Sequence, residues 1–541
     1  MRTKYTILYF FVAILTLGGA LSCSDFLTED PRGQMATANF FKSENDLDAA
    51  LTALYSLVTY QNDANNEVGT EAQWGDDIST HPASNKVNLR EYDQYNVSEN
   101  QASWMPRLWK ARYQIIKGAN FIINNAPDCE NTSKAKITMA LANAYYWRAF
   151  NYFYLVTTWG EVPLILNEEI TLDVQLSSVE EIYEQIISDL EKAEEGCPDN
   201  YTTEPYARNG INIAVSKGAV KATMAYVYMA MAGWPMNKTE YYKQAAAKAK
   251  EVIDGVNSGK YYYSLLPEYR LIHSQEWNDK NPETLLGIYY NRITKKTQSP
   301  VCDILDDMGG WNDTNGEIKF WKEFPEGPRK EATYFPKIFL KAEVKAGNPI
   351  LRDWWENPTG GRPVVAPVFM KTVESSDENK EYDYTNHEES VPSNGNKHHQ
   401  VIRLAEVYCW YAEAVGRSGE VNQLAVDVLN KVRNRADGIN SNIYSTSMSP
   451  AELAEAAWKE HGWEIAGYYW CGFATRARDM FRMYRYKDHF EFRVRNPEIE
   501  VAPGVFRKEA VPVTGTWSDK KMYAPRPYVD NITLNPNLAN N

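Results

Sequence analysis

The residues best suited to chemistry are tryptophans that lie outside any helical pattern, in stretches rich in Gly, Asn and Asp. Trp74 stands beside Asp76 and Asp77, and Trp311 stands beside Asn312 in the run Met308 to Asn315. A flat aromatic ring offers apolar area at a low entropy cost, and nearby carboxylates and amides can hydrogen-bond hydroxyl groups. Such sets suit the capture of a sugar ring. The candidate ligand-binding residues are Trp74, Asp76, Asp77, Trp104, Trp311, Asn312, Trp321, Trp354 and Trp355.

Each of these aromatic rings also has a structural interpretation. Large aromatic side chains often anchor a loop onto a scaffold instead of contacting a ligand. The sequence therefore predicts that some of the set bind ligand, without deciding which.

Catalytic chemistry has weaker support. A glycosidase needs two carboxylates at a defined separation, but among 71 acidic residues a suitable pair arises by chance. Glu161, Glu406 and Glu413 lie on or near predicted helices, where scaffold hydrogen bonds or solvated faces explain them. His398 and His399 are adjacent, so they cannot share one face of a helix or strand, and no HExxH or GxSxG motif occurs. We expect no enzyme activity, with an exported all-α glycoside hydrolase as the alternative.

A calcium site is a further alternative near Trp311. Four acidic residues there could supply oxygen ligands: Asp303, Asp306, Asp307 and Asp313. The spacing of an EF-hand is absent because Trp311 would occupy its first position. A solvated loop explains the acidic residues more simply. We therefore expect no cofactor and keep a structural Ca²⁺ as the weaker hypothesis.

The elements that must position these loops are helices. Helical periodicity and capping residues predict helices over 107–125, 134–159, 216–232, 240–254, 401–417 and 421–435, with others starting at Ser43, Ser178 and Ser449. The last of these is expected to run toward Tyr486. Paired Ala-rich helices at 216–254 and 401–435 are typical of tetratricopeptide-like units.

Two long stretches lack a helical period, 61–104 and 258–400, apart from a short extended segment at Thr284 to Tyr290. Irregular stretches of this length inside a compact protein are usually functional or disordered. The predicted fold class is therefore mainly all-α, a tetratricopeptide-like helix-pair scaffold with long irregular ligand-binding loops and a loop-rich C-terminal part.

The N-terminus predicts export. Arg2 and Lys4 precede an apolar run over 5–17, which is too short to span a bilayer, since spanning takes about 20 apolar residues. This is the layout of a signal peptide over residues 1–22. The ending Leu21-Ser22-Cys23 resembles a bacterial lipobox, where cleavage leaves the cysteine as the lipid-bearing first residue. The alternative is an ordinary signal peptide with a cysteine near its cleavage point. Residues 23–42 are then predicted to form a tether between the lipid and the folded part of the chain.

Charge and cysteine usage narrow the class further. The formal net charge of −14 argues against a nucleic-acid partner, because phosphate binding needs a basic face. The cysteines beyond Cys23 are Cys129, Cys197, Cys302, Cys409 and Cys471. Their wide scatter indicates no disulfide framework and no thiolate metal site, so we interpret most of them as small buried apolar residues.

Several stretches, in order along the chain, resemble the SusD/RagB family of outer-membrane nutrient-binding lipoproteins. Trp147 to Leu164 is similar to the family signature RAF.YF.L…WG.VPL, and Arg403 to Arg433 to its R.AEV…YAEA…LN.VR block. The opening Cys23 to Leu27 and the ending Pro525 to Leu538 also match. Two departures occur near the C-terminal helix: Glu460-His461 replaces a glutamate-arginine pair, and Tyr468 to Arg476 matches poorly.

The resemblance implies a single helical domain in which an N-terminal region, 43–257, and a C-terminal region, 258–541, form one integrated fold. It also implies an outer-membrane, lipid-anchored (palmitate-bearing) protein that faces the cell exterior and captures an oligosaccharide. The implied partner is a SusC-like TonB-dependent transporter, to which the glycan is delivered. Some members of the family take peptides, so a RagB-like peptide-binding protein remains the first alternative.

Overall fold

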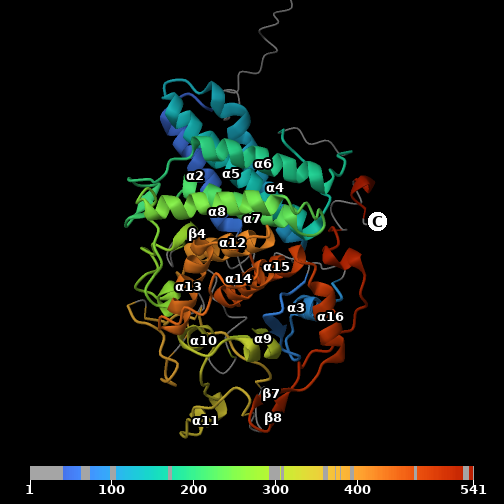
Figure 1. Cartoon of the computed structure of the whole chain (residues 1–541). Helices are drawn as coiled ribbons and strands as arrows, with labels where there is room; N and C mark the ends of the chain where they lie inside the picture. Colours follow the sequence, from blue (N-terminus) through green and yellow to red (C-terminus); the bar gives the residue numbers. More distant parts are fainter. Residues whose placement is uncertain are drawn as a thin grey trace, which may run out of the picture.

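Packed helices form the body of the molecule (Figure 1). The computed structural model describes residues 40–61, 73–97, 105–167, 173–290, 305, 310–356, 364–371, 373–377, 379–389, 391, 395–467, 472–527 and 535–539. The principal helices are α2 (Glu44–Gln61), α4 (Met105–Asn125), α5 (Lys134–Trp159), α6 (Val179–Gly196), α7 (Lys217–Ala232), α8 (Tyr241–Asn257), α12 (Leu404–Arg417), α13 (Gln423–Asp437) and α14 (Pro450–Ile465). Neighbours along the chain pack together, as α4 does on α5, α5 on α6, and α7 on α8. The mainly all-α fold predicted from the sequence is confirmed.

Local signals in the sequence account for the helix ends. Ser178 and Glu181 form a reciprocal capping box at the start of α6, and Ser449 with Glu452 does the same for α14. The helix α5 ends at Gly160, whose φ of 72° favours glycine. Nearly every side chain of α5 from Ala140 onward is buried, because α4 and α6 cover it on different sides. The boundaries predicted for α5 are confirmed.

The main hydrophobic core runs through most of the chain. It draws buried side chains from Phe41 near the N-terminus to Ala524 near the C-terminus. A second cluster, which includes Phe335, Trp354 and Val368, lies under the irregular segments. The three cysteines within the described residues, Cys129, Cys197 and Cys409, are all buried with free thiols, as the sequence predicted for them. Cys302 and Cys471 lie outside the described part of the chain.

Four parts of the chain differ from the predictions, one of them being the stretch 258–400, which was predicted to be irregular and contains several short helices. Residues 401–403 belong to strand β6 (His399–Arg403), which pairs with β4 (Thr284–Ile288), so helix α12 begins only at Leu404. The stretch 61–104 contains a helix, α3 (Val87–Asp93), whose seven residues are too few to show a period. The last helical region is divided into α14, α15 (Arg476–Arg482) and α16 (Tyr486–Arg495).

Short elements complete the fold at the lower end in Figure 1. These are helices α9 (Ile318–Glu323), α10 (Pro328–Thr333) and α11 (Lys341–Lys345), the 3₁₀-helix η4 (Tyr269–His273), and the hairpin of β7 (Ile499–Ala502) and β8 (Val505–Arg507). Strand β1 (Ile78–Thr80) pairs antiparallel with β5 (Thr314–Gly316), and β2 (Ala207–Arg208) with β3 (Ile211–Asn212).

A buried ionic network holds the C-terminal helices to the central segments. Its guanidinium groups belong to Arg329, Arg403 and Arg435, and its carboxylates to Glu283, Glu460 and Glu464. All six side chains are at most 4 % exposed. Glu406, 3.7 Å from Arg403, and Arg433, 3.8 Å from Glu460, extend the network further.

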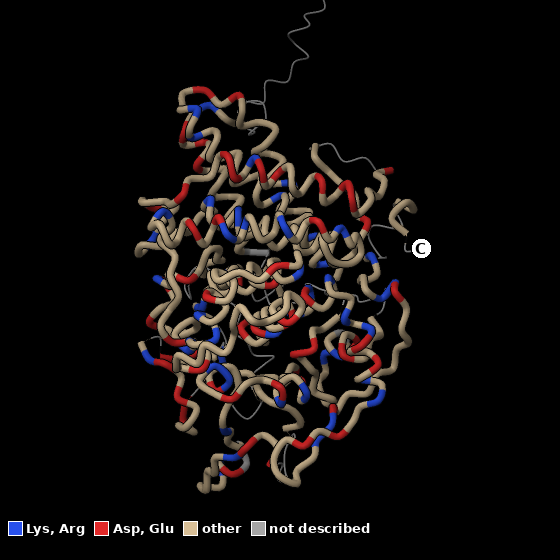
Figure 2. Tube along the Cα trace, viewed as in Figure 1, with Lys and Arg blue, Asp and Glu red and all other residues tan. Residues whose placement is uncertain are grey.

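Charges of both signs are interspersed along the whole trace (Figure 2). Within the described residues, no helix is both long enough and apolar enough to cross a membrane.

Candidate functional site

The fold joins the two loops that carry the predicted Trp74 and Trp311 clusters. Strands β1 and β5 pair with Ser79 opposite Asn315. Beside this pairing, the backbone N–H of His81 donates to the Asp313 carbonyl at 2.9 Å, and the Ser84 hydroxyl donates to the Asp313 carboxylate at 2.5 Å. Segments more than 200 residues apart in sequence thus form one platform, which we call the β1–β5 platform (residues 73–93 and 310–317).

Trp311 is the exposed aromatic ring of this platform. Its side chain is 46 % exposed, and the Lys86 ammonium lies 4.4 Å from the ring centroid. The next residue, Asn312, is fully buried and has a φ of 48°, a left-handed conformation that asparagine adopts more readily than most residues. The turn at Asn312 therefore directs one side chain into the protein while its neighbour stays at the surface.

Trp74 has the opposite environment. Its side chain is 2 % exposed, its indole N–H donates to the Leu89 carbonyl at 3.2 Å, and its ring centroid lies 4.8 Å from that of Tyr92. The ring anchors helix α3 to strand β1 within the platform. In this structure it presents no face on which a sugar could stack.

The two aspartates after Trp74 also connect the platform to the C-terminal region. Asp76 forms a two-pronged ion pair with Arg476, at 2.6 and 3.0 Å. Burial is the largest single influence on Asp76 and acts to raise its pKa, but the charge and hydrogen bonds of Arg476, with smaller contributions from His489 and Lys319, together lower the pKa. Asp77 accepts a 2.7 Å hydrogen bond from the Gly467 N–H, and burial raises its pKa to about 7. Both side chains hold the platform in place.

The other predicted tryptophans form a separate group. Trp321, Trp354 and Trp355 have ring centroids 5.4 to 5.6 Å apart. Trp354 is buried, whereas the other two are partly buried around α9, which follows β5 directly. The Lys330 amine lies 4.2 Å from the Trp321 ring. Trp104 lies outside the described residues, so its role in ligand binding stays a prediction.

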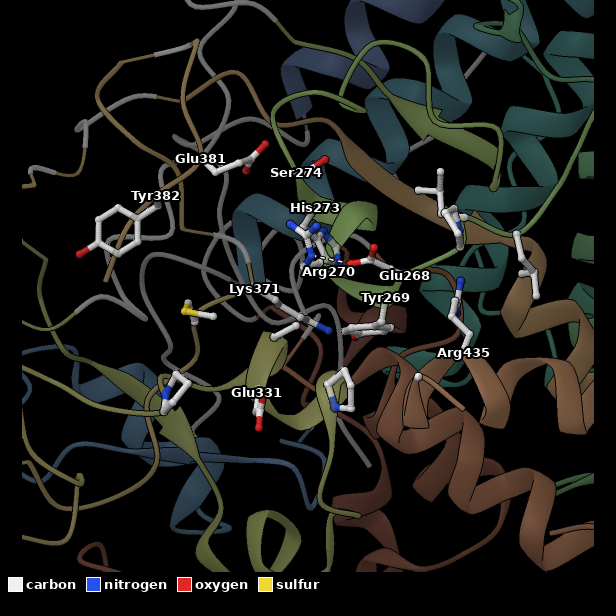
Figure 3. Close-up of a pocket in the computed structure, with 18 of the residues that line it drawn as sticks. Glu268, Tyr269, Arg270, His273, Ser274, Glu331, Lys371, Glu381, Tyr382 and Arg435 are labelled. Atoms are coloured by element: carbon white, nitrogen blue, oxygen red, sulfur yellow. Dashed lines mark hydrogen bonds and ion pairs between the residues drawn. The ribbon is translucent and has the colours of Figure 1, made fainter. Parts of the chain in front are cut away.

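The tertiary structure builds a large cavity beside the platform that no local sequence pattern predicts. It has a volume of about 1070 Å³ and is lined by η4, α10, the end of α13 and described residues between Met370 and Lys397 (Figure 3). Its residues come from positions 265 to 440, and no local pattern connects them. Segment 364–371 separates the cavity from the platform, because Pro367 accepts a hydrogen bond from Gly316 and Met370 donates one to Thr333.

Three of the side chains weighed for catalysis have structural partners, whereas Glu161 is exposed at the surface. Glu413 binds Arg482 and Arg417, and Glu406 caps the first turn of α12. His398 contacts Asp279 at 2.6 Å. Across the residues that the structure describes, no three His, Cys, Asp or Glu side chains gather as a metal site. Of the acidic residues considered for Ca²⁺, only Asp313 lies within the described part, and it accepts the Ser84 hydrogen bond.

The fold and the platform define an α-helical scaffold protein that presents loops from packed helix pairs. Residues 25–229 match a SusD-like family described as "Starch-binding associating with outer membrane", and residues 370–541 match the SusD family. The chain belongs to the SusD/RagB family, which confirms the resemblance seen in the sequence.

Relatives cover most of the chain. SusD-like protein P2 of Formosa agariphila is 26 % identical over 483 residues, 84 % of each chain. A SusD-like protein of Bacteroides ovatus is 24 % identical over 486 residues, 86 % of this chain and 80 % of that one. Among solved structures, a SusD homolog from Bacteroides thetaiotaomicron has a TM-score of 0.71 at 19 % identity, covering 93 % of this chain and 97 % of that one. A laminarin-binding SusD-like protein has a TM-score of 0.67 at 21 % identity, covering 92 % and 98 %. At these identities the structural likeness concerns the fold.

Proposed function

We propose that this protein is a non-enzymatic, cell-surface lipoprotein that binds an oligosaccharide on the β1–β5 platform. The observation that carries the proposal is the half-exposed ring of Trp311, held on a loop that buried neighbours keep in place. A rigid aromatic face with polar neighbours is suited to the apolar face of a pyranose ring. A structural neighbour is described as laminarin-binding, and another was solved with a xylogluco-oligosaccharide.

The proposal extends to delivery and anchoring. A lipid on Cys23 would hold the mature chain at the outer membrane, and residues 23–42 would serve as its tether. A SusC-like TonB-dependent transporter would then receive the bound glycan. Family membership is the support for this partner.

Affinity electrophoresis of the purified mature protein on a panel of neutral polysaccharides tests the binding proposal. We expect retardation in at least one glycan gel and no release of reducing ends on incubation. Release of reducing ends would favour the glycoside hydrolase alternative. Retardation in no gel would favour the peptide-binding alternative, which a peptide panel measured by calorimetry would then check.

A further inference from the structure

The cavity in Figure 3 is an open cleft large enough for a ligand. Its volume of about 1070 Å³ lies just above the usual range for ligand pockets, about 300–1,000 Å³. Figure 3 shows the Lys371 side chain reaching into it, with Tyr382 on one side and Tyr269 and Arg435 on the other. Tyr382 and Tyr384 are partly buried and meet the ring of Phe335 edge-on, at 6.1 and 6.4 Å, which holds them against the second core cluster.

Charge is divided between the depth of the cavity and its rim. The acidic residues that line it, Glu268, Glu331 and Glu381, are all exposed. Glu268 is moreover paired with exposed Arg270 at 2.7 Å. The amine of Lys371, by contrast, belongs to a side chain that is 5 % exposed. A buried amine therefore lies in the depth of the cavity, whereas its rim carries exposed charges of both signs, with Arg270 and Lys431 beside the three glutamates.

The nearby carboxylates only partly compensate the charge of Lys371. Glu464, Asp77 and Glu406 favour its charged form, but burial and the Arg403 charge outweigh them. Arg435 lines the cavity, and Glu283 and Glu464 bind its guanidinium group. Lys397 also lines the cavity; its amine donates to the Val373 carbonyl at 2.7 Å, and the charges of Glu374 and Glu381 act on it. A buried cation in a low-dielectric cavity attracts an anion far more strongly than a surface cation does.

We propose that this cavity is a second saccharide site, and that it takes a sugar bearing an anionic group, either the carboxylate of a uronic acid or a sulfate ester. The anionic group would lie against the Lys371 amine, and the sugar ring would lie along Tyr382 and Tyr384. The inference rests on the proposed glycan-binding function and adds a ligand class that the Trp311 platform does not require.

The charges around Lys371 predict how this binding depends on pH. Burial and then the Arg403 charge lower the pKa of Lys371 to about 7, while Glu464, Asp77 and Glu406 act in the opposite direction. Burial also lowers the pKa of His273 well below its usual value and lowers that of Lys397. His273 therefore stays neutral near pH 7. The amine of Lys371 is protonated below about pH 7, so anion affinity should fall as the pH rises from 6 to 8.5, by up to about tenfold per unit above pH 7.

The test compares two variants by calorimetry on the full mature chain. The probes are an oligogalacturonate, a sulfated galactan oligosaccharide and a neutral laminari-oligosaccharide of equal length. Lys371→Met removes the buried charge at similar volume and should weaken binding of the anionic probe roughly 10- to 100-fold, the usual contribution of a charge-assisted hydrogen bond. The matched control is Lys431→Met, which removes the same charge from the exposed rim and should change the affinity less than about threefold.

The probes separate the two sources of the anion, and the neutral probe separates this inference from the proposed function. Binding of only the carboxylate or only the sulfate probe identifies the anionic group. Failure of both anionic probes to bind the wild-type protein, or equal affinity in Lys371→Met and wild type, overturns the inference. Neutral binding that is lost in Trp311→Ala but kept in Lys371→Met leaves the proposed function intact. If Lys371→Met does not fold, the pH slope of the wild-type protein decides, and a flat slope between pH 6 and 8.5 counts against the inference.

Discussion

Replacing Trp311 by alanine tests the binding platform most directly. A tryptophan side chain presents about 250 Å² of surface, and the 46 % exposure of Trp311 leaves about 115 Å² of it open to a ligand. A sugar ring that covers one face would bury about half of this area. At about 25 cal/mol per Å², that burial contributes about 1.5 kcal/mol, so Trp311→Ala should raise the Kd for the bound glycan about tenfold.

The loss of stability in this variant should be small by comparison. The ring loses its contact with Lys86, a cation–π interaction that contributes about 0.5–1 kcal/mol at an exposed site, together with its partly buried contacts. We expect a total loss of about 1–2 kcal/mol in the free energy of unfolding. Binding should therefore be measured well below the Tm, by affinity electrophoresis and then by calorimetry with the glycan that retards the protein.

Two further variants make the test of Trp311 specific. Trp311→Phe keeps an aromatic face and should recover most of the affinity. Tyr262→Ala removes a similarly exposed aromatic ring, 60 % exposed, from the segment after α8, and should leave the affinity unchanged. The reasoning fails if folded Trp311→Ala binds within about twofold of wild type, or if Tyr262→Ala weakens binding equally.

Four other outcomes are expected. Trp74→Ala should lower the free energy of unfolding by about 3–5 kcal/mol in urea denaturation, because it leaves a cavity where the buried ring was. An unchanged free energy of unfolding in this variant would show that the ring is not packed as described. Wild-type stability should contain a component that falls as the pH rises from about 4 to 7, because the unfolded state releases the Asp77 proton in this window whereas the folded state, with a pKa of about 7, retains it. Burial raises the pKa of Glu509 to about 8, and this residue contributes in the same direction. Asp77→Asn should flatten that slope, and an unchanged slope would assign it to another group. Glu464→Gln should destabilise the fold by about 3–5 kcal/mol, measured by urea denaturation followed by circular dichroism, because Arg403 and Arg435 would lose a buried carboxylate; a loss below about 1 kcal/mol would contradict this role. Cys23→Ala should move the protein from the membrane fraction to the soluble fraction. Retention of this variant in the membrane fraction would contradict the lipid anchor.

Local residue patterns were sufficient to predict the helical scaffold and the family. Capping boxes such as Ser178 with Glu181 involve residues three apart, so they are readable without the fold. The apolar run of α5 likewise requires burial on every side, whatever covers it. Predicted helix boundaries differ from the structure where strand pairing competes with a local helical preference. Val401 and Ile402 continue the pattern of α12, yet they lie in β6 because β4 supplies the backbone partners.

Which tryptophan faces solvent depends on contacts between segments that are far apart in the sequence. Trp74 and Trp311 both follow polar, glycine-containing stretches, and nothing within a few residues of either distinguishes them. Leu89 and Tyr92, more than a helical turn away in sequence, enclose the first ring, whereas the turn at Asn312 leaves the second at the surface. The cavity around Lys371 is a stronger case, since its lining comes from positions 265 to 440. The exposure of a tryptophan ring and the pKa of a lysine amine depend on neighbours that are distant in sequence. Local residue patterns carry no information about those neighbours.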